Sequence, residues 1–197
     1  EPHARWVLGM VEVFEHTVAG NLDEAEALND ANFALGTEIG EDDAFIIFAG
    51  QFYQYRSFAW RIEELFPVVE EAAASGSLPF KLAYGIQCAR FSRVPEAQVI
   101  LDEAAQVDFT NVANDWHWPT SMMGYAVLAN DIKDVAAAEL LIDRLAPYAA
   151  QNVFNGATSQ ACLRANVGRA LSCVGEYATA EQYLHDSTDV PPARRWI

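Results

Sequence analysis

The sequence predicts an all-α protein, built as a right-handed α-solenoid of about five helix–turn–helix pairs. Apolar residues recur at steps of three and four along most of the chain, as amphipathic helices require. Strand signals are poor, because two-residue alternation is not sustained and the one hairpin-like dipeptide, Asn155-Gly156, lacks alternating flanks. A short pattern of residue sizes returns every 32 to 43 residues, which indicates stacked helical pairs.

Composition, periodicity and end signals place the helices in order. Alanine accounts for 33 of the 197 residues, and alanine, leucine and glutamate favour helix. Pro79, Pro95 and Pro119 stand where helices begin, whereas clusters such as Ser75-Gly76-Ser77 stand where helices end. We expect about ten helices, at residues 3–19, 22–38, 42–57, 61–74, 79–91, 95–106, 117–130, 134–149, 157–174 and 177–186.

The recurring pattern is a small residue that ends one helix, a large apolar residue two positions later, and an alanine three positions after that. The two clear copies are Gly20-Leu22-Ala25 and Gly175-Tyr177-Ala180, and a looser copy is Ser92-Val94-Ala97. Weaker copies follow Trp60, where Leu65 takes the alanine position, and surround Asp131 and Ala137. One helical pair cannot bury its own apolar stripe, so we expect the pairs to stack into a continuous core.

These residues resemble tetratricopeptide repeats, over most of the chain. A closer resemblance is to the repeat-rich C-terminal region of large actinobacterial signalling proteins, which join such repeats to cyclase, ATPase or DNA-binding domains. The stretches that carry it are Phe48–Arg56, Asp115-Trp116, Leu140–Ala149 and Ala161–Leu163 with Gly168. The resemblance implies a regulatory portion of such a protein and a concave groove lined by the first helix of each pair. It implies no activity for this chain, which lacks the family's phosphate loop, cyclase carboxylates and DNA-reading helix.

The predicted domain organisation is one tetratricopeptide-like domain over residues 1–190, followed by a truncated tail at 191–197. The chain lacks an initiator methionine and opens on Glu1-Pro2, and we expect it to be a fragment of a longer protein.

The charge balance excludes several classes of function. The chain has 12 Lys and Arg against 28 Asp and Glu, a formal charge of −16, and a surface this acidic repels a nucleic acid. The most apolar stretch, 44–50, is too short to cross a membrane.

Three cysteines without CxxC spacing predict buried thiols in a cytoplasmic protein. Ten acidic residues lie between Arg5 and Arg56 with no lysine or arginine among them. Such a run forms either a solvated face or a docking face for a basic partner.

The sequence gives no sign of catalysis. No phosphate loop, dinucleotide fingerprint, zinc-protease or nucleophile-elbow motif occurs. Glu12 and His16 share a helix face, but without further ligands an ordinary surface pair is favoured over a metal site. We therefore predict no catalytic residue, no metal and no cofactor.

Candidate partner-binding residues fall into two groups. Side chains on the first helices of the pairs could clamp a peptide carboxylate, or the arginines among them could bridge the abundant acids within the array; these are Tyr55, Arg56, Arg90, Arg164 and Arg169. Trp116 and Trp118 form the densest aromatic cluster, which could stack on a ligand or could pack between repeats beside a capping residue, Asp115 or Asn114.

The predicted function is a non-enzymatic module that binds a protein or peptide in its groove, as the regulatory or sensory region of a bacterial signalling or transcription-regulatory protein. The alternative is a small-molecule-binding or catalytic helical domain that uses Trp116, Trp118 and nearby arginines. Homo-oligomerisation is a third hypothesis, because the terminal helices look too apolar to be caps. No nucleic-acid or membrane partner is expected.

Overall fold

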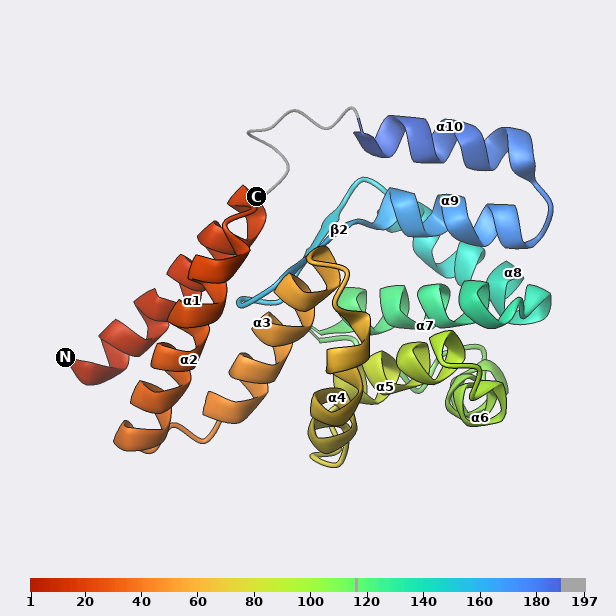
Figure 1. Ribbon diagram of the computed structural model, residues 1–197. Helices are drawn as coiled ribbons and strands as arrows, with labels where there is room; N and C mark the ends of the chain where they lie inside the picture. The colour runs from red at the N-terminus through yellow and green to blue at the C-terminus, as the bar shows by residue number, and fades with distance from the viewer. Residues whose placement is uncertain (116, 189–197) are drawn as a thin grey trace. The chain divides into compact units, whose positions relative to one another are not determined.

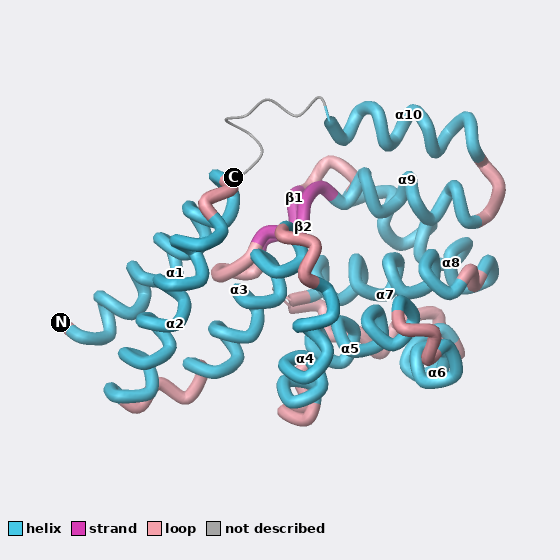
Figure 2. The backbone as a smooth tube through the Cα atoms, in the orientation of Figure 1, coloured by secondary structure: helices cyan, strands magenta, loops and turns pink. Residues whose placement is uncertain are grey.

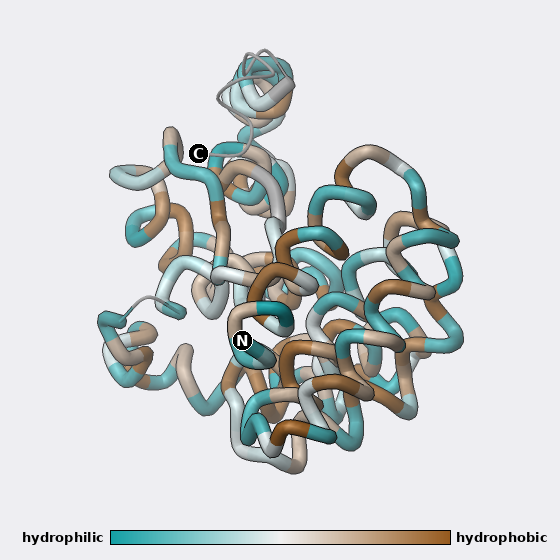
Figure 3. The backbone as a smooth tube through the Cα atoms, turned by 90° about the vertical axis from the view of Figure 1, so that its left-hand side faces the viewer, coloured by the Kyte–Doolittle hydropathy of each residue, from teal (hydrophilic) through white to brown (hydrophobic). Residues whose placement is uncertain are grey.

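The computed structural model describes residues 1–115 and 117–188, with only the backbone at 160, 161 and 188 (Figure 1). The predicted all-α class is confirmed for this part of the chain, in which helices dominate and one small hairpin is the exception (Figure 2). Hydrophobic and hydrophilic residues alternate around the helical turns, as expected of amphipathic helices (Figure 3).

The chain divides into two compact units. The first contains residues 1–75 with 156–158, and the second contains the described residues of 76–155 and of 159–188. The single domain predicted over 1–190 stays a prediction, and the predicted tail at 191–197 lies outside the described residues.

In the first unit, successive helices pack against one another: α1 with α2, α2 with α3, and α3 with α4. Their core contains the fully buried Val13, Ala25, Tyr55, Leu65 and Val69. The elements are α1 (Pro2–Ala19), α2 (Leu22–Ile39), α3 (Ala44–Phe58), the 3-10 turn η1 (Ile62–Glu64) and α4 (Leu65–Ala73).

In the second unit, α5, α7 and α9 lie side by side, and each is followed by a helix that packs against it (Figure 1). Its core includes the fully buried Leu82, Leu101, Met122, Leu128 and Leu163. The helices are α5 (Leu78–Arg90), α6 (Val94–Ala105), α7 (Trp118–Ile132), α8 (Val135–Leu145), the 3-10 turn η2 (Ala146–Tyr148), α9 (Leu163–Cys173) and α10 (Tyr177–Thr188).

One predicted helix, 157–174, is wrong over its first six residues. Strand β1 (Asn152–Phe154) pairs antiparallel with β2 (Ser159–Cys162), with Asn152 opposite Cys162 and Phe154 opposite Ser159, and α9 begins only at Leu163. Gly156 takes a φ of +88° in the connecting turn, which glycine adopts without strain. The strands are too short to display the alternation that would have identified them.

The first helix of each predicted pair ends in the same turn, which also ends α2 at Gly40. One or two positions after the last helical residue, a residue takes a left-handed φ, and the next backbone N–H donates to the carbonyl five residues earlier, as in a Schellman motif. The left-handed residues are Gly20, Trp60, Ser92, Lys133 and Gly175, with φ of 83, 58, 63, 63 and 90°. The bonds are Asn21 to His16, Arg61 to Arg56, Arg93 to Cys88, Asp134 to Ala129 and Glu176 to Leu171, at 2.7 to 3.0 Å.

A buried residue follows each of these turns five positions later. Ala25, Leu65, Ala97 and Ala138 are 0% exposed and Ala180 is 3% exposed. In the fourth copy the turn therefore starts at Lys133 and points to Ala138, which corrects the placement at Asp131 and Ala137. The local geometry thus repeats at steps of 32 to 42 residues.

Candidate functional site

The first unit carries most of the chain's charge. Residues 1–75 contain 15 Asp and Glu against three arginines, so this segment accounts for −12 of the formal −16. Between Arg5 and Lys81 the only cations of lysine or arginine type are Arg56 and Arg61. The contacts of these two arginines therefore determine how the acidic unit is held together and what remains on its surface.

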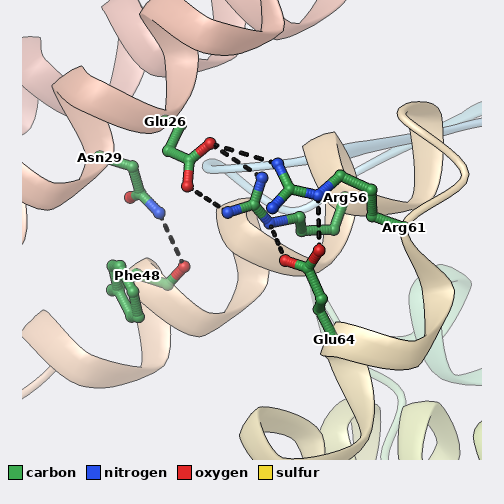
Figure 4. Close-up of polar contacts among 6 residues, drawn as sticks. All are labelled: Glu26, Asn29, Phe48, Arg56, Arg61 and Glu64. Atoms are coloured by element: carbon green, nitrogen blue, oxygen red, sulfur yellow. Dashed lines mark hydrogen bonds and ion pairs between the residues drawn. The ribbon is translucent and has the colours of Figure 1, made fainter.

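Arg56 lies near the end of α3, and its side chain is only 7% exposed. Its two terminal nitrogens donate to both oxygens of Glu26 on α2, Nη1 to Oε2 at 2.8 Å and Nη2 to Oε1 (Figure 4). Its Nε lies 3.1 Å from Glu64 Oε2 on η1. This bidentate pairing is the strong form of the arginine–carboxylate contact, and it joins three elements.

Arg61 completes the network from the turn that follows α3. Its Nε donates to Glu64 Oε1 at 2.6 Å, and its Nη1 lies 3.7 Å from Glu26 Oε2 (Figure 4). The hydrogen bond from Arg61 lowers the pKa of Glu64, with further contributions from the charges of Arg56 and Arg61. Glu64 therefore stays ionised as the shared anion of both arginines.

Aromatic rings and an amide enclose the inner side of the network. The Arg56 guanidinium carbon lies 5.1 Å from the centre of the Phe52 ring and 5.3 Å from that of Tyr55. Asn29 on α2 donates to the carbonyl of Phe48 on α3 at 3.1 Å (Figure 4). Burial raises the pKa of Tyr55 to about 12, against the opposing effects of Asn29 and Arg56.

Chemically, this arrangement is suited to fastening helices. A ligand carboxylate could reach Arg56 only by displacing Glu26 or Glu64, and Tyr55, which is 1% exposed, presents no surface to a ligand. In the sequence-derived set, Arg56 thus matches the alternative of bridging within the array. Its network fixes the end of α3 and the turn at 59–61.

The other predicted arginines lie in the second unit. Arg90 on α5 pairs with Asp131 on α7, Nε to Oδ2 at 3.4 Å. Arg164 on α9 has Nη1 at 3.8 Å from Oδ2 of Asp186 on α10. Arg169, also on α9, is exposed and makes no ion pair within the described part of the chain. Of the five first-helix candidates, Arg169 is the one left most open to a partner.

The predicted tryptophan cluster is described in part. Trp116 lies outside the described residues, whereas Trp118 begins α7 and its ring meets that of Tyr148 edge to face, with centroids 5.1 Å apart. Oδ1 of Asp115 accepts the backbone N–H of His117 at 2.8 Å. The ring contact matches the packing alternative, whereas the predicted capping by Asp115 or Asn114 is wrong, because the N-cap residue is His117 and its side chain makes no capping hydrogen bond.

Sequence reasoning did not identify Glu26 and Glu64 as partners of Arg56, nor Trp60 as a surface feature. Glu26 is 30 residues from Arg56, and no periodic pattern links them. The repeat pattern could have identified Trp60 as a turn residue, because Trp60 stands five residues before a buried apolar position, as Gly20 and Gly175 do. At that position a small residue was expected, and a tryptophan is the exception.

The thiols and metal-binding residue types define no further site. Cys88 and Cys162 are buried as expected and Cys173 is half-buried. Burial raises the pKa of Cys88 and of Cys173, which lowers their nucleophilicity at neutral pH. Among the described residues, no three or more His, Cys, Asp and Glu side chains converge to hold a metal ion. In the same residues, every helix is too short or too polar to span a membrane.

The chain matches no family model, no curated protein and no solved structure. The resemblance to actinobacterial signalling proteins therefore stays a prediction, and function must be inferred from the repeat and the charges.

Proposed function

We propose that this chain is a non-enzymatic, tetratricopeptide-like module that binds a protein or peptide. Its ten helices form five pairs stacked as a right-handed α-solenoid, and the first helices line the binding groove. It serves as the regulatory or sensory region of a larger bacterial signalling or transcription-regulatory protein in the cytoplasm. Binding in the groove changes the activity of the domains to which the module is joined.

The recurrence of one helix-ending turn carries this proposal. Five helices combine this turn with a buried residue five positions later, whereas α2 ends in the same turn at Gly40 without a buried residue at that distance. Extended stacks of helical pairs present a long surface to a partner. The side-by-side packing of α5, α7 and α9 supports the assignment of the groove to first helices.

The charge on the groove helices supports a peptide partner. Arg169 is exposed on α9, and Arg90 is 37% exposed beside Asp131. An arginine without an internal acid retains its donors for a carboxylate of a bound peptide. The small-molecule alternative, based on Trp116 and Trp118, gains no support from Trp118, whose ring packs on Tyr148.

Selection of binders from a random peptide library tests the proposal. We expect recovered peptides to carry an acidic residue or a free carboxylate, and Arg169→Gln to weaken their binding about tenfold, because a charge-assisted hydrogen bond is lost. Arg144→Gln is the matched control, since Arg144 lies on α8, a second helix. Equal loss in both variants, or no recovered peptide, would contradict a first-helix groove.

A further inference from the structure

The turn after α3 exposes a tryptophan in a conformation that tryptophan disfavours. Trp60 has a φ of +58° and is 82% exposed, the highest value among large hydrophobic residues in the described part of the chain. The left-handed region suits glycine, and a bulky side chain there is an outlier. Equivalent turns use Gly20, Ser92, Lys133 and Gly175. The exposed ring therefore contributes no buried packing to offset its backbone strain.

The Arg56 network fixes this turn. The backbone N–H of Arg61 donates to the Arg56 carbonyl at 3.0 Å, and that of Trp60 donates to Ser57 at 3.2 Å. The side chains of Arg56 and Arg61 are both held by Glu26 and Glu64, on either side of the tryptophan in sequence. The ring thus projects from a pre-organised base, which lowers the entropy lost when a partner binds it.

The surface around Trp60 is acidic. Glu64 hydrogen-bonds Arg61 and, with smaller effects from the charges of Glu26 and Asp23, raises the pKa of Arg61. Glu26 and Glu64 are paired with Arg56 and Arg61, whereas Asp23 and Glu63 are exposed. Phe58, 49% exposed, adds a second aromatic side chain at the same helix end.

We propose that Trp60, with Phe58 and the exposed carboxylates Asp23 and Glu63, binds an arginine- or lysine-rich segment of a partner protein. A tryptophan face attracts guanidinium and ammonium groups, and tryptophan and arginine are the residue types most enriched at energetic centres of interfaces. The −12 charge of residues 1–75 attracts such a segment over distance. The same charge disfavours a second copy of this chain and any nucleic acid as occupant.

This inference rests on the proposed protein-binding role, but it concerns a surface at a helix end instead of the first-helix groove. The two can be separated, because Arg169 lies on α9 in the other unit. If wild type binds acidic peptides in a manner that needs Arg169 but the arginine peptide does not bind through Trp60, the inference alone fails; if the arginine peptide binds through Trp60 but no acidic peptide binds through Arg169, the groove proposal alone fails.

Titration with a fluorescent twelve-residue peptide of alternating arginine and alanine tests the inference. We expect Trp60→Gly to lower the affinity at least tenfold while shifting the urea midpoint of unfolding upward, because glycine relieves the strained φ. Ser92→Gly is the matched control: it removes the same kind of strain at the equivalent turn and leaves the affinity unchanged. Trp60→Phe is expected to retain part of the affinity.

Three results would overturn the inference. The first is equal affinity of wild type and Trp60→Gly for the arginine peptide. The second is a wild-type affinity no higher than for a peptide of alternating glutamate and alanine. The third is a lowered urea midpoint in Trp60→Gly, which would show that the ring stabilises the fold.

Discussion

Arg56 shows how this acidic chain keeps a buried cation. Taking a guanidinium out of water is costly, and only close carboxylates with good geometry offset that cost. Glu26 supplies two hydrogen bonds and Glu64 supplies a third contact. Removal of one partner therefore leaves a buried charge without full compensation, and the loss exceeds that of a surface ion pair.

Glu26→Gln is expected to lower the free energy of unfolding by about 2 kcal/mol, because a neutral amide cannot replace the charged bidentate contact. Urea denaturation monitored by circular dichroism measures the change. Glu15→Gln on the exposed side of α1 is the control, with an expected change within about 0.5 kcal/mol. Equal effects in both variants would mean that the network adds nothing to stability.

The buried tyrosines predict a loss of stability at alkaline pH. Burial raises the pKa of Tyr55 and of Tyr125 to about 12 from an ordinary value of 10.0. The unfolded chain loses these protons first, so their contribution is complete below pH 10 and is lost as the pH rises towards 12. Each tyrosine contributes a slope of up to about 1.4 kcal/mol per pH unit in that window.

Tyr55→Phe and Tyr125→Phe should each reduce this slope, and the double variant should reduce it most. The free energy of unfolding is measured at several pH values between 8 and 12. An unchanged slope in the double variant would show that other groups cause the alkaline loss.

At the scale of elements, helical glycines set how closely neighbouring helices approach. A Cβ at Gly36 on α2 would lie 2.5 Å from Trp6 Nε1 on α1 and 2.9 Å from Ala44 Cβ on α3. A Cβ at Gly85 on α5 would meet the tips of Ile100 and Leu128 at 3.1 and 3.2 Å. The neighbours of a Cβ at Gly36 are a rigid ring and a short side chain, whereas those of a Cβ at Gly85 are the flexible ends of side chains.

Gly36→Ala is therefore expected to destabilise the chain by about 1–3 kcal/mol, since overpacking outweighs the helix-propensity gain of about 1 kcal/mol. Gly85→Ala, the matched control, should change stability by less than about 1 kcal/mol. Thermal melts and urea titrations measure both. A stabilised Gly36→Ala would indicate that α1 can move away from α2 at little cost.

The sequence predicts helix ends well where local chemistry decides them. Leu22 and Tyr177 begin helices at the predicted residues, because a left-handed glycine ends each preceding helix. The hairpin was missed, because strands of three and four residues are too short for a periodic signal. The partners of Arg56 were missed too, because contacts over 30 residues depend on packing that local patterns do not encode.

At the scale of the molecule, the uneven charge makes stability depend on salt. Residues 1–75 have a formal net charge of −12. These charges repel one another over the Debye length, which is about 30 Å at an ionic strength of 0.01 M and about 8 Å at 0.15 M. Screening relieves this repulsion, while the buried Arg56 pairs are screened much less.

The urea midpoint is therefore expected to rise between 0.01 and 0.15 M sodium chloride. Glu15→Lys, which removes two units of negative charge from the segment, should reduce the rise. A midpoint that falls with salt would show that surface ion pairs, and not repulsion, dominate the electrostatics.

The five left-handed turns also separate what folding constrains from what evolution can vary. Folding requires the backbone conformation at each turn and the buried residue five positions later. The turn residue is exposed in all five cases, and it is a glycine, a serine, a lysine or a tryptophan. Mutation at these positions can therefore change the chemistry of the surface without repacking the core. A residue other than glycine at such a turn adds backbone strain, so a new surface side chain there lowers stability without disturbing the core.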